Sequence, residues 1–185
     1  MNVFLDFEAS SLADGSYPIE VAWVFEDGRC ESHLIAPTPE WTDWDEKAEA
    51  IHGIARAELN ARGTPPAQVA ARMVAELSGH DLFASAPSWD GKWLSVLLRG
   101  AGWPRHTLRL RDTDEALRET ALELLSPVLG QPELDRQVHN LAARASVGGP
   151  ERPAHRALAD AQEEYRTWAR LRDAARVLAE ELRPS

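Results

Sequence analysis

The sequence lacks the residues and segments on which several classes of protein depend. Its only cysteine is Cys30, which excludes an intrachain disulfide framework and a cysteine-based metal site. No apolar run approaches the roughly 18 residues of a membrane span. Met1 leads straight into an apolar segment without the basic stretch of a secretory signal. These absences predict a cytoplasmic protein that works in a reducing compartment and without a membrane.

Positive charge is also scarce. Against 30 Asp and Glu there are 20 Lys and Arg, so the formal net charge is −10. This balance argues against a protein that holds long duplex nucleic acid on a broad basic surface. It is compatible with an enzyme that grips a short or single-stranded end at a metal site, because bound cations supply local positive charge. At 185 residues the chain can bury a sizeable core, and we expect 1–185 to form one domain.

The order of the apolar segments predicts an α/β fold with a mixed sheet. The Asp27-Gly28 pair is a strong hairpin signal between the second and third strands. Strands are expected at 2–8, 19–25, 30–36, 81–85 and 108–111. Helices are expected at 47–54, 56–62, 66–77, 91–100, 113–125, 133–145 and 156–182. A turn-rich connection precedes the last helix, at 147–154.

The first predicted strand carries two carboxylates on one face. Asp6 and Glu8 are two residues apart, so they point the same way, with Cα atoms roughly 6.5 Å apart. The rest of the strand is apolar, which is typical of a buried central strand, where neighbouring carboxylates repel each other and resist burial. A divalent cation removes both penalties, because Mg²⁺ and Mn²⁺ prefer oxygen ligands. The alternative is a pair of exposed carboxylates at a strand end.

The last predicted helix places a third carboxylate on its buried side. Apolar residues recur at steps of three and four and make a stripe that faces the core: Leu158, Ala161, Tyr165, Trp168, Leu171, Ala175, Leu178 and Leu182. At ~100° per residue, Asp160 falls within roughly 60° of the centre of this stripe. A carboxylate there is costly unless it is paired or bound to metal. Glu164 falls on the same side, either as a further acid of the site or because this end of the stripe is open to water.

Two further residues have both a structural and a chemical interpretation. Asp90 follows the fourth strand and precedes a helix, so it is either an N-cap or a fourth acid that faces the end of the first strand. His155 follows a Gly- and Pro-containing stretch, five residues before Asp160. It is either an exposed loop histidine or a general base. No comparable context surrounds His33, His80, His106 or His139.

Taken together, these residues resemble the motifs of the DnaQ-like (DEDDh) 3'-5' exonuclease family, in the RNase H-like superfamily. The similar segments, in chain order, are Phe4–Leu12, Ile51–Ile54, Trp89-Asp90 and His155–Ala161. The resemblance implies an RNase H-like fold, a five-stranded mixed sheet whose first three strands are antiparallel, flanked by helices. One departure is Ala86, where many relatives carry an Asn; Trp89, in place of a Phe, is a milder one. The change at Ala86 bears on the substrate class more than on the chemistry.

The resemblance also implies roles for these residues. One divalent cation would be held by Asp6, Glu8 and Asp160. A second would be held by Asp6 and Asp90, and His155 would deprotonate the attacking water. Two cations, Mg²⁺ or Mn²⁺, would stabilise the attacking and leaving oxygens of a phosphodiester. Nucleoside 5'-monophosphates would leave the 3' end of single-stranded or short RNA or DNA. The terminal nucleotide would be contacted by Ser10, Leu12 and His52. Some small relatives are dimers, and the long last helix has surface enough for a homodimer.

Two other classes of function stay open at this point. One is a catalytically weak RNase H-like module that binds nucleic acid ends or partner proteins, and the presence of all five catalytic-type residues speaks against it. The other is a metal-dependent nucleotide phosphohydrolase on a different scaffold, which the strand-borne Asp-x-Glu and the helix-borne His-x4-Asp disfavour. Trp41 and Trp44, in an acidic loop, either stack on nucleobases or pin the loop to the body of the protein.

Overall fold

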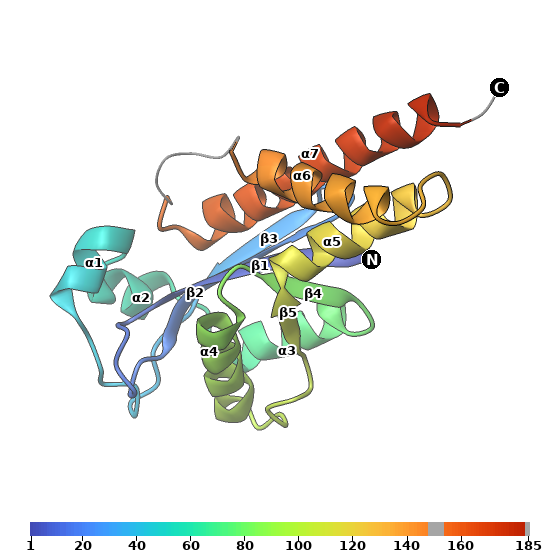
Figure 1. The fold of residues 1–185 in the computed structure, drawn as a ribbon. Coiled ribbons are helices and arrows are strands. Elements are labelled where there is room, and N and C mark those ends of the chain that lie inside the picture. Colours follow the sequence, from blue (N-terminus) through green and yellow to red (C-terminus); the bar gives the residue numbers. More distant parts are fainter. Residues whose placement is uncertain (148–153, 184–185) are drawn as a thin grey trace.

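A computed structural model of the chain describes residues 1–147 and 154–183, which are built around a five-stranded sheet (Figure 1). The strands are β1 (Asn2–Ala9), β2 (Pro18–Phe25), β3 (Cys30–Leu34), β4 (Asp81–Ala84) and β5 (Leu110–Asp112). They lie in the order β3-β2-β1-β4-β5. The pairs β1–β2 and β2–β3 are antiparallel, whereas β1–β4 and β4–β5 are parallel. The predicted mixed sheet with three antiparallel strands is therefore confirmed.

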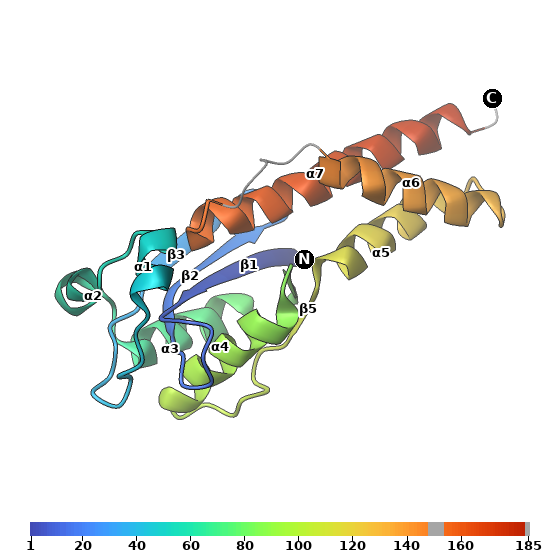
Figure 2. The ribbon, with the colours of Figure 1, turned by 60° about the vertical axis from the view of Figure 1, so that its left-hand side comes forward.

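The helices cover both faces of this sheet. They are α1 (Glu46–His52), α2 (Arg56–Arg62), α3 (Pro66–Leu77), α4 (Pro87–Gly100), α5 (Thr113–Leu125), α6 (Glu133–Val147) and α7 (Ala157–Glu181). Figures 1 and 2 show α3 and α4 on one face and α5, α6 and α7 on the other, with α1 and α2 at one end of the sheet. In the part of the chain that the structure describes, no helix is long and apolar enough to cross a membrane. Most of the expected turn-rich connection lies outside the described residues.

The start of α4 differs from the sequence prediction. The helix begins at Pro87 instead of Gly91. Proline suits a first turn, because its fixed φ is already helical and its missing N–H would have no helical partner there. Ala86 is the N-cap residue and provides no side-chain cap. Asp90 therefore lies within the first turn of α4 and is 2 % exposed, so its interpretation as the N-cap was wrong.

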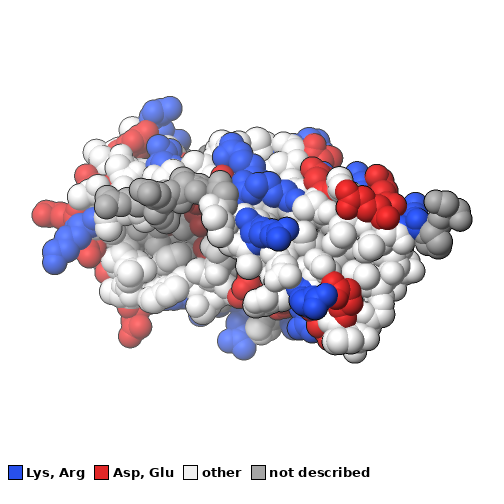
Figure 3. Space-filling view, turned by 45° about the horizontal axis from the view of Figure 1, so that its top comes forward, with Lys and Arg blue, Asp and Glu red and all other residues white. Residues whose placement is uncertain are grey.

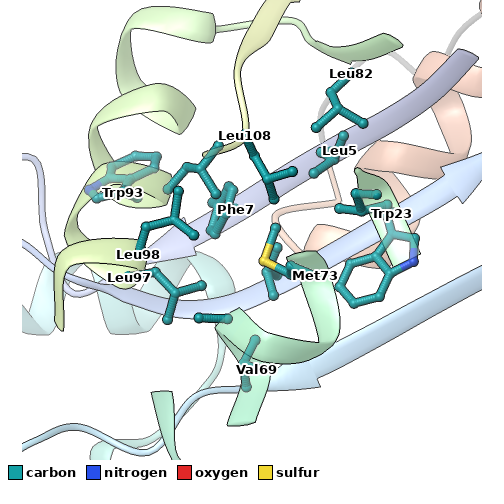
Figure 4. Close-up of a cluster of buried hydrophobic side chains, with 14 of the residues drawn as sticks. Leu5, Phe7, Trp23, Val69, Met73, Leu82, Trp93, Leu97, Leu98 and Leu108 are labelled. Atoms are coloured by element: carbon teal, nitrogen blue, oxygen red, sulfur yellow. The ribbon is translucent and has the colours of Figure 1, made fainter. Parts of the chain in front are cut away.

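One face of the sheet packs against α3 and α4. Alternation along β1 turns Val3, Leu5 and Phe7 to this face. Figure 4 shows Leu5 and Phe7 with Trp23 of β2, packed among Val69 and Met73 of α3 and Trp93, Leu97 and Leu98 of α4. This cluster holds α4 against the sheet and thereby fixes the position of its first turn.

The opposite face of the sheet packs against α5, α6 and α7. Phe4 of β1 lies 5.6 Å from Trp168 of α7, measured between ring centroids. The buried stripe of α7 consists of Ala157, Ala161, Trp168, Leu171, Ala175 and Ala179. It shares Ala161, Trp168, Leu171 and Ala175 with the predicted stripe. The other predicted members are less buried: Leu158, Tyr165 and Leu178 are half-buried, and Leu182 is 41 % exposed. Since Phe4 and Asp6 share a face of β1, the same alternation turns Asp6 and Glu8 toward α7.

Candidate active site

Three carboxylates meet near the end of β1 and the start of α7. Asp6 and Glu8 project from β1, and Asp160 projects from the first turn of α7. Each carboxylate offers an oxygen that lies within 4.8 Å of those offered by the other two. The packing of α7 across β1 and β2 brings together residues more than half the chain apart. The structure thus places these three predicted ligands in one cluster.

The donor set of this cluster fits a divalent cation. Burial raises the pKa of Asp6 well above its usual value, and the nearby charges of Asp90 and Glu8 raise it further. Burial and the charge of Asp160 raise the pKa of Glu8 to about 7, although Arg156 acts in the opposite direction. Carboxylates gathered against this electrostatic cost are typical of a cation site, because hard oxygen ligands suit Mg²⁺ and Mn²⁺.

Asp90 lies beside the three-carboxylate cluster. After burial, its charge is the largest cause of the raised pKa of Asp6. It does not belong to the set of oxygens within 4.8 Å of one another. Burial raises the pKa of Asp90 to about 7, and backbone hydrogen bonds from Phe7 and Ala86 partly offset this. The fourth acid thus comes from the first turn of α4, and it is not among the residues that line the cavity with Asp6, Glu8 and Asp160.

His155 immediately precedes α7 in a strained backbone conformation. Its φ of 52° is the only positive φ outside glycine in the described ranges. Such a conformation costs on the order of 1 kcal/mol and persists only where neighbouring contacts hold it. Asp160 supplies two of them: Ala154 N donates to Oδ1 over 2.8 Å and Arg156 N donates to Oδ2 over 3.2 Å. Asp160 thus fixes the turn that presents His155.

His155 and the three carboxylates line one cavity of about 580 Å³. This volume lies within the range of about 300–1,000 Å³ that is usual for small-molecule sites. Its far wall is formed by the start of α5, the end of α6 and the next turns of α7. The polar residues of this wall were not predicted from the sequence; they include Asp112, Thr113, Asp114, Ser146, Glu163 and Thr167.

Glu164 is a further acid of the cavity wall. Its Oε1 accepts a hydrogen bond from Ser85 N over 3.0 Å, and its Oε2 accepts one from Thr113 Oγ1 over 2.6 Å. Burial raises the pKa of Glu164 to about 7 despite these donors. Its charge also contributes to the raised pKa of Asp6. Of the two interpretations of Glu164, the structure therefore favours an acid at the site.

The three residues expected to contact a terminal nucleotide do not line this cavity. Ser10 is fully buried, and its hydroxyl donates to Asp43 over 2.8 Å. Leu12 is 69 % exposed. His52 is buried: its Nδ1 accepts from Ile54 N over 3.0 Å, and its Nε2 has no hydrogen-bond partner among the described residues. Their contact with a nucleotide stays a prediction.

The two loop tryptophans are attached to the protein body. Trp41 stacks on the buried ring of Tyr17, with centroids 5.2 Å apart. Trp44 donates its indole N–H to Glu49 over 2.8 Å and meets His52 edge-on. These contacts support the interpretation that Trp41 and Trp44 pin the loop, since both rings already have partners.

An ion pair between the buried Glu20 and the half-exposed Arg156 lies next to the cluster and was not predicted from the sequence. Glu20 lies opposite Glu8 in the β1–β2 register and is 4 % exposed. It pairs with Arg156, the residue between His155 and α7, over 2.7 Å. The signal was present in the sequence, because Glu20 is the only charged residue in an otherwise apolar strand.

The described residues on the face that carries α6 and α7 form no broad basic surface that would hold a long polyanion. Figure 3 shows the face that carries α6 and α7, where several Lys and Arg gather near the middle and acidic residues lie toward both ends. No broad positive field covers this view, in keeping with the net charge of −10. Basic residues on this face could therefore contact only a short stretch of nucleic acid.

Comparison with known proteins identifies the fold. No protein-family model and no curated protein matches the sequence. The zinc-bound form of E. coli exonuclease I in complex with single-stranded DNA matches with a TM-score of 0.65 and 19 % identity, over 97 % of this chain and 42 % of that one. E. coli exonuclease I in complex with a dT13 oligonucleotide matches with a TM-score of 0.65, 18 % identity and the same coverage.

A product-bound structure of exonuclease I is similar with a TM-score of 0.62 and 17 % identity, over 97 % of this chain and 45 % of that one. The chain thus spans less than half the length of each of these three exonuclease I chains. At such identities the likeness concerns the fold, and it agrees with the strand order and helix placement described above. The protein has the RNase H-like fold of exonuclease I, as its sequence motifs predicted.

Proposed function

We propose that this protein is a metal-dependent 3'-5' exonuclease of the DnaQ-like (DEDDh) type. The observation that carries the proposal is the meeting of Asp6, Glu8 and Asp160 within 4.8 Å in a cavity that His155 also lines. The fold supports it, because structures with the same fold include exonuclease I in complex with single-stranded DNA. Fold alone does not fix a function, so the proposal rests on the site.

The acids divide into two groups around Asp6. Asp6, Glu8 and Asp160 would hold one divalent cation, and Asp6 with Asp90 would hold a second, Mg²⁺ or Mn²⁺ in each case. Bound cations supply charge stabilisation to the phosphodiester as it is attacked and to the oxygen that leaves. Deprotonated carboxylates are required for this, and cations favour that form of Asp6 and Glu8 over the protonated form that burial favours.

His155 would accept the proton of the attacking water. A neutral imidazole within reach of a water molecule can accept its proton and so act as a general base. The strained turn and the hydrogen bonds to Asp160 hold the residue at the cavity. Attack at phosphorus breaks the P–O3' bond. It yields a nucleoside 5'-monophosphate and a chain that is one nucleotide shorter, with a free 3'-hydroxyl.

Single-stranded or short RNA or DNA would be the substrate. The net charge of −10 and the absence of a broad basic field in Figure 3 disfavour a long duplex. The exposed Leu12, after the end of β1, would pack as an apolar wedge against the terminal base. Ser10 and His52 would shape the same region, Ser10 through its backbone because its hydroxyl is already bound to Asp43.

Degradation of 5'-labelled RNA and DNA oligomers tests the proposal. Wild-type protein with Mn²⁺ or Mg²⁺ should shorten one or both from the 3' end, and chelator should stop the reaction. Asp160→Asn should be inactive, whereas Asp173→Asn, an exposed position on the same helix, should retain activity. No cleavage of either polymer under any divalent metal would refute the exonuclease. Binding of ends without cleavage would then favour the non-catalytic module.

A further inference from the structure

Glu20 and Arg156 form a forked ion pair between β2 and the start of α7, in which Glu20 is buried and Arg156 is half-exposed. Arg156 Nη2 donates to Glu20 Oε1 over 2.7 Å, and Arg156 Nε donates to Oε2 over 3.1 Å. The Glu20 side chain is 5 % exposed, while that of Arg156 is 50 % exposed. A two-point contact of this kind fixes orientation as well as distance, because the guanidinium is planar and rigid.

Glu20 also caps the N-terminus of α7, a role usually filled by the side chain of the N-cap residue. Arg156 is the N-cap residue, and its side chain makes no cap hydrogen bond within its own helix. Instead Ala157 N, at the first position of the helix, donates to Glu20 Oε2 over 3.0 Å. A carboxylate at a helix N-terminus satisfies a free N–H and interacts favourably with the helix dipole. The start of α7 is therefore anchored from β2, by a residue 137 positions earlier in the chain.

The anchor joins the two halves of the carboxylate cluster. On the sheet side, Glu20 lies directly opposite Glu8 in the β1–β2 register. On the helix side, Arg156 adjoins His155, and its backbone N–H donates to Asp160 Oδ2 over 3.2 Å. The route from Glu8 through Glu20 and Arg156 to Asp160 consists of one cross-strand pair and direct hydrogen bonds. Through these few contacts, the position of β2 beside Glu8 fixes the position of Asp160 at the start of α7.

We propose that the Glu20–Arg156 pair is a positioning clamp that sets where Asp160 and His155 lie relative to Asp6 and Glu8. Neither residue needs to touch metal or substrate; both act through the residues that do. The catalytic consequence rests on the proposed exonuclease function, whereas the consequence for metal binding does not. Partners that orient metal ligands change metal affinity or activity by about 10–100-fold when they are removed.

Two variants break different parts of the clamp. Glu20→Gln keeps the shape and one acceptor but loses the charge and half of the fork. Arg156→Lys keeps the charge but loses the rigid contact through two nitrogens that the planar guanidinium makes. Each should weaken Mn²⁺ binding about tenfold or more, as measured by calorimetry without substrate. Each should also lower kcat on an oligonucleotide by a similar factor with little change in KM, since the substrate's own contacts remain.

Arg72 and Glu31 provide a matched control. Arg72 binds both oxygens of Glu31 through Nε and Nη2, at distances of 2.9–3.2 Å. This pair joins α3 to β3 on the face of the sheet away from α7. Glu31→Gln should leave the Mn²⁺ affinity and kcat unchanged. The melting temperature of Glu31→Gln therefore shows how much stability is lost when a forked Arg–Glu pair is broken away from the carboxylate cluster.

Rescue by guanidinium ion distinguishes a loss of positioning from a general loss of stability in an Arg156 variant. In Arg156→Ala the half-exposed pocket of the lost side chain is open to solvent. Guanidinium ion, far below denaturing concentration, should restore part of the Mn²⁺ affinity of this variant and should not affect Glu20→Gln. Rescue would not occur if the residue contributed only bulk stability.

The outcomes separate the clamp from the proposed function. Unchanged Mn²⁺ affinity in folded Glu20→Gln and Arg156→Lys would overturn the clamp, even if their melting temperatures fell. Wild-type protein that binds Mn²⁺ but cleaves no oligonucleotide would refute the exonuclease, and the Mn²⁺ affinities of the variants would still decide the clamp. Wild-type protein that binds no Mn²⁺ would overturn both.

Discussion

Thr113 donates its hydroxyl hydrogen to Glu164 Oε2 over 2.6 Å, and this bond ties the start of α5 to α7 across the cavity. Ser85 N, at the end of β4, donates to the other oxygen of the same carboxylate over 3.0 Å. Three elements therefore meet at one half-buried acid, and burial raises the pKa of this acid to about 7. Above that pH the carboxylate is charged and depends on both donors, because a buried charge without hydrogen bonds is costly.

Thr113→Val should destabilise the metal-free protein by about 1.5–3 kcal/mol at pH 8, the range for a hydrogen bond to a charged group. The loss should be smaller at pH 5, where Glu164 is protonated. Denaturant unfolding at the two pH values measures the difference. Thr120→Val is the control, since Thr120 accepts from the neutral indole of Trp168 over 2.8 Å and its loss should not depend on pH. Equal pH dependence in the two variants would contradict the account of Glu164.

The metal-free protein should lose stability between about pH 5 and pH 8. A carboxyl group whose pKa is raised on folding contributes fully below its unfolded value and loses that contribution as pH rises through its folded value. For Glu8 this window runs from the ordinary value of 4.5 to about 7, and for Asp90 from 3.8 to about 7. With chelator present, each 1 kcal/mol lost should lower Tm by about 2–4 °C in a chain of this size.

Asp6→Asn tests the cause of this pH dependence. The substitution removes the charge at the centre of the acidic group, so the fall of Tm between pH 5 and pH 8 should become shallower. Mn²⁺ should raise the Tm of wild type at pH 8 and have little effect on this variant, because binding to the folded state stabilises it by mass action. A pH profile identical to that of wild type would exclude the buried carboxylates as its source.

His155→Asn should lower kcat by about 10²–10⁴-fold, the usual contribution of a general base. Asn tolerates a positive φ better than most residues, so the strained turn at 52° should be kept. Mn²⁺ affinity should be unchanged, since Asp160 and Glu8 remain in place. His139→Asn, an exposed position on α6, is the control. Turnover close to wild type in His155→Asn would remove His155 from its proposed role.

The parts of the site that follow local periodicity could be predicted from the sequence. Alternation along the first strand placed Asp6 and Glu8 on one face, and the stripe of the last helix placed Asp160 on its inner side. The fold class followed from the same patterns together with the motif resemblance. The two placements of the carboxylates succeeded because each needed only the geometry of a single strand or helix.

The parts that depend on packing between distant elements could not be predicted. Asp90 was taken as a candidate N-cap because Gly91 looked like the start of the helix, but Pro87 is a better first residue. The Glu20–Arg156 pair joins residues 136 positions apart, and only the register of β2 against the start of α7 brings them together. The acids of the far cavity wall could not be predicted for the same reason, since α5 packs against α7 only in the folded chain.

The direction and metal dependence of cleavage test the central claim most directly. An oligonucleotide labelled at its 5' end in one reaction and at its 3' end in another is incubated with the protein and Mn²⁺. The account predicts a ladder of shortening products from the 5' label and immediate release of labelled mononucleotide from the 3' label. Both should be abolished by chelator and by Asp160→Asn. Internal cuts, release from the 5' end, or no reaction with any divalent metal would contradict it.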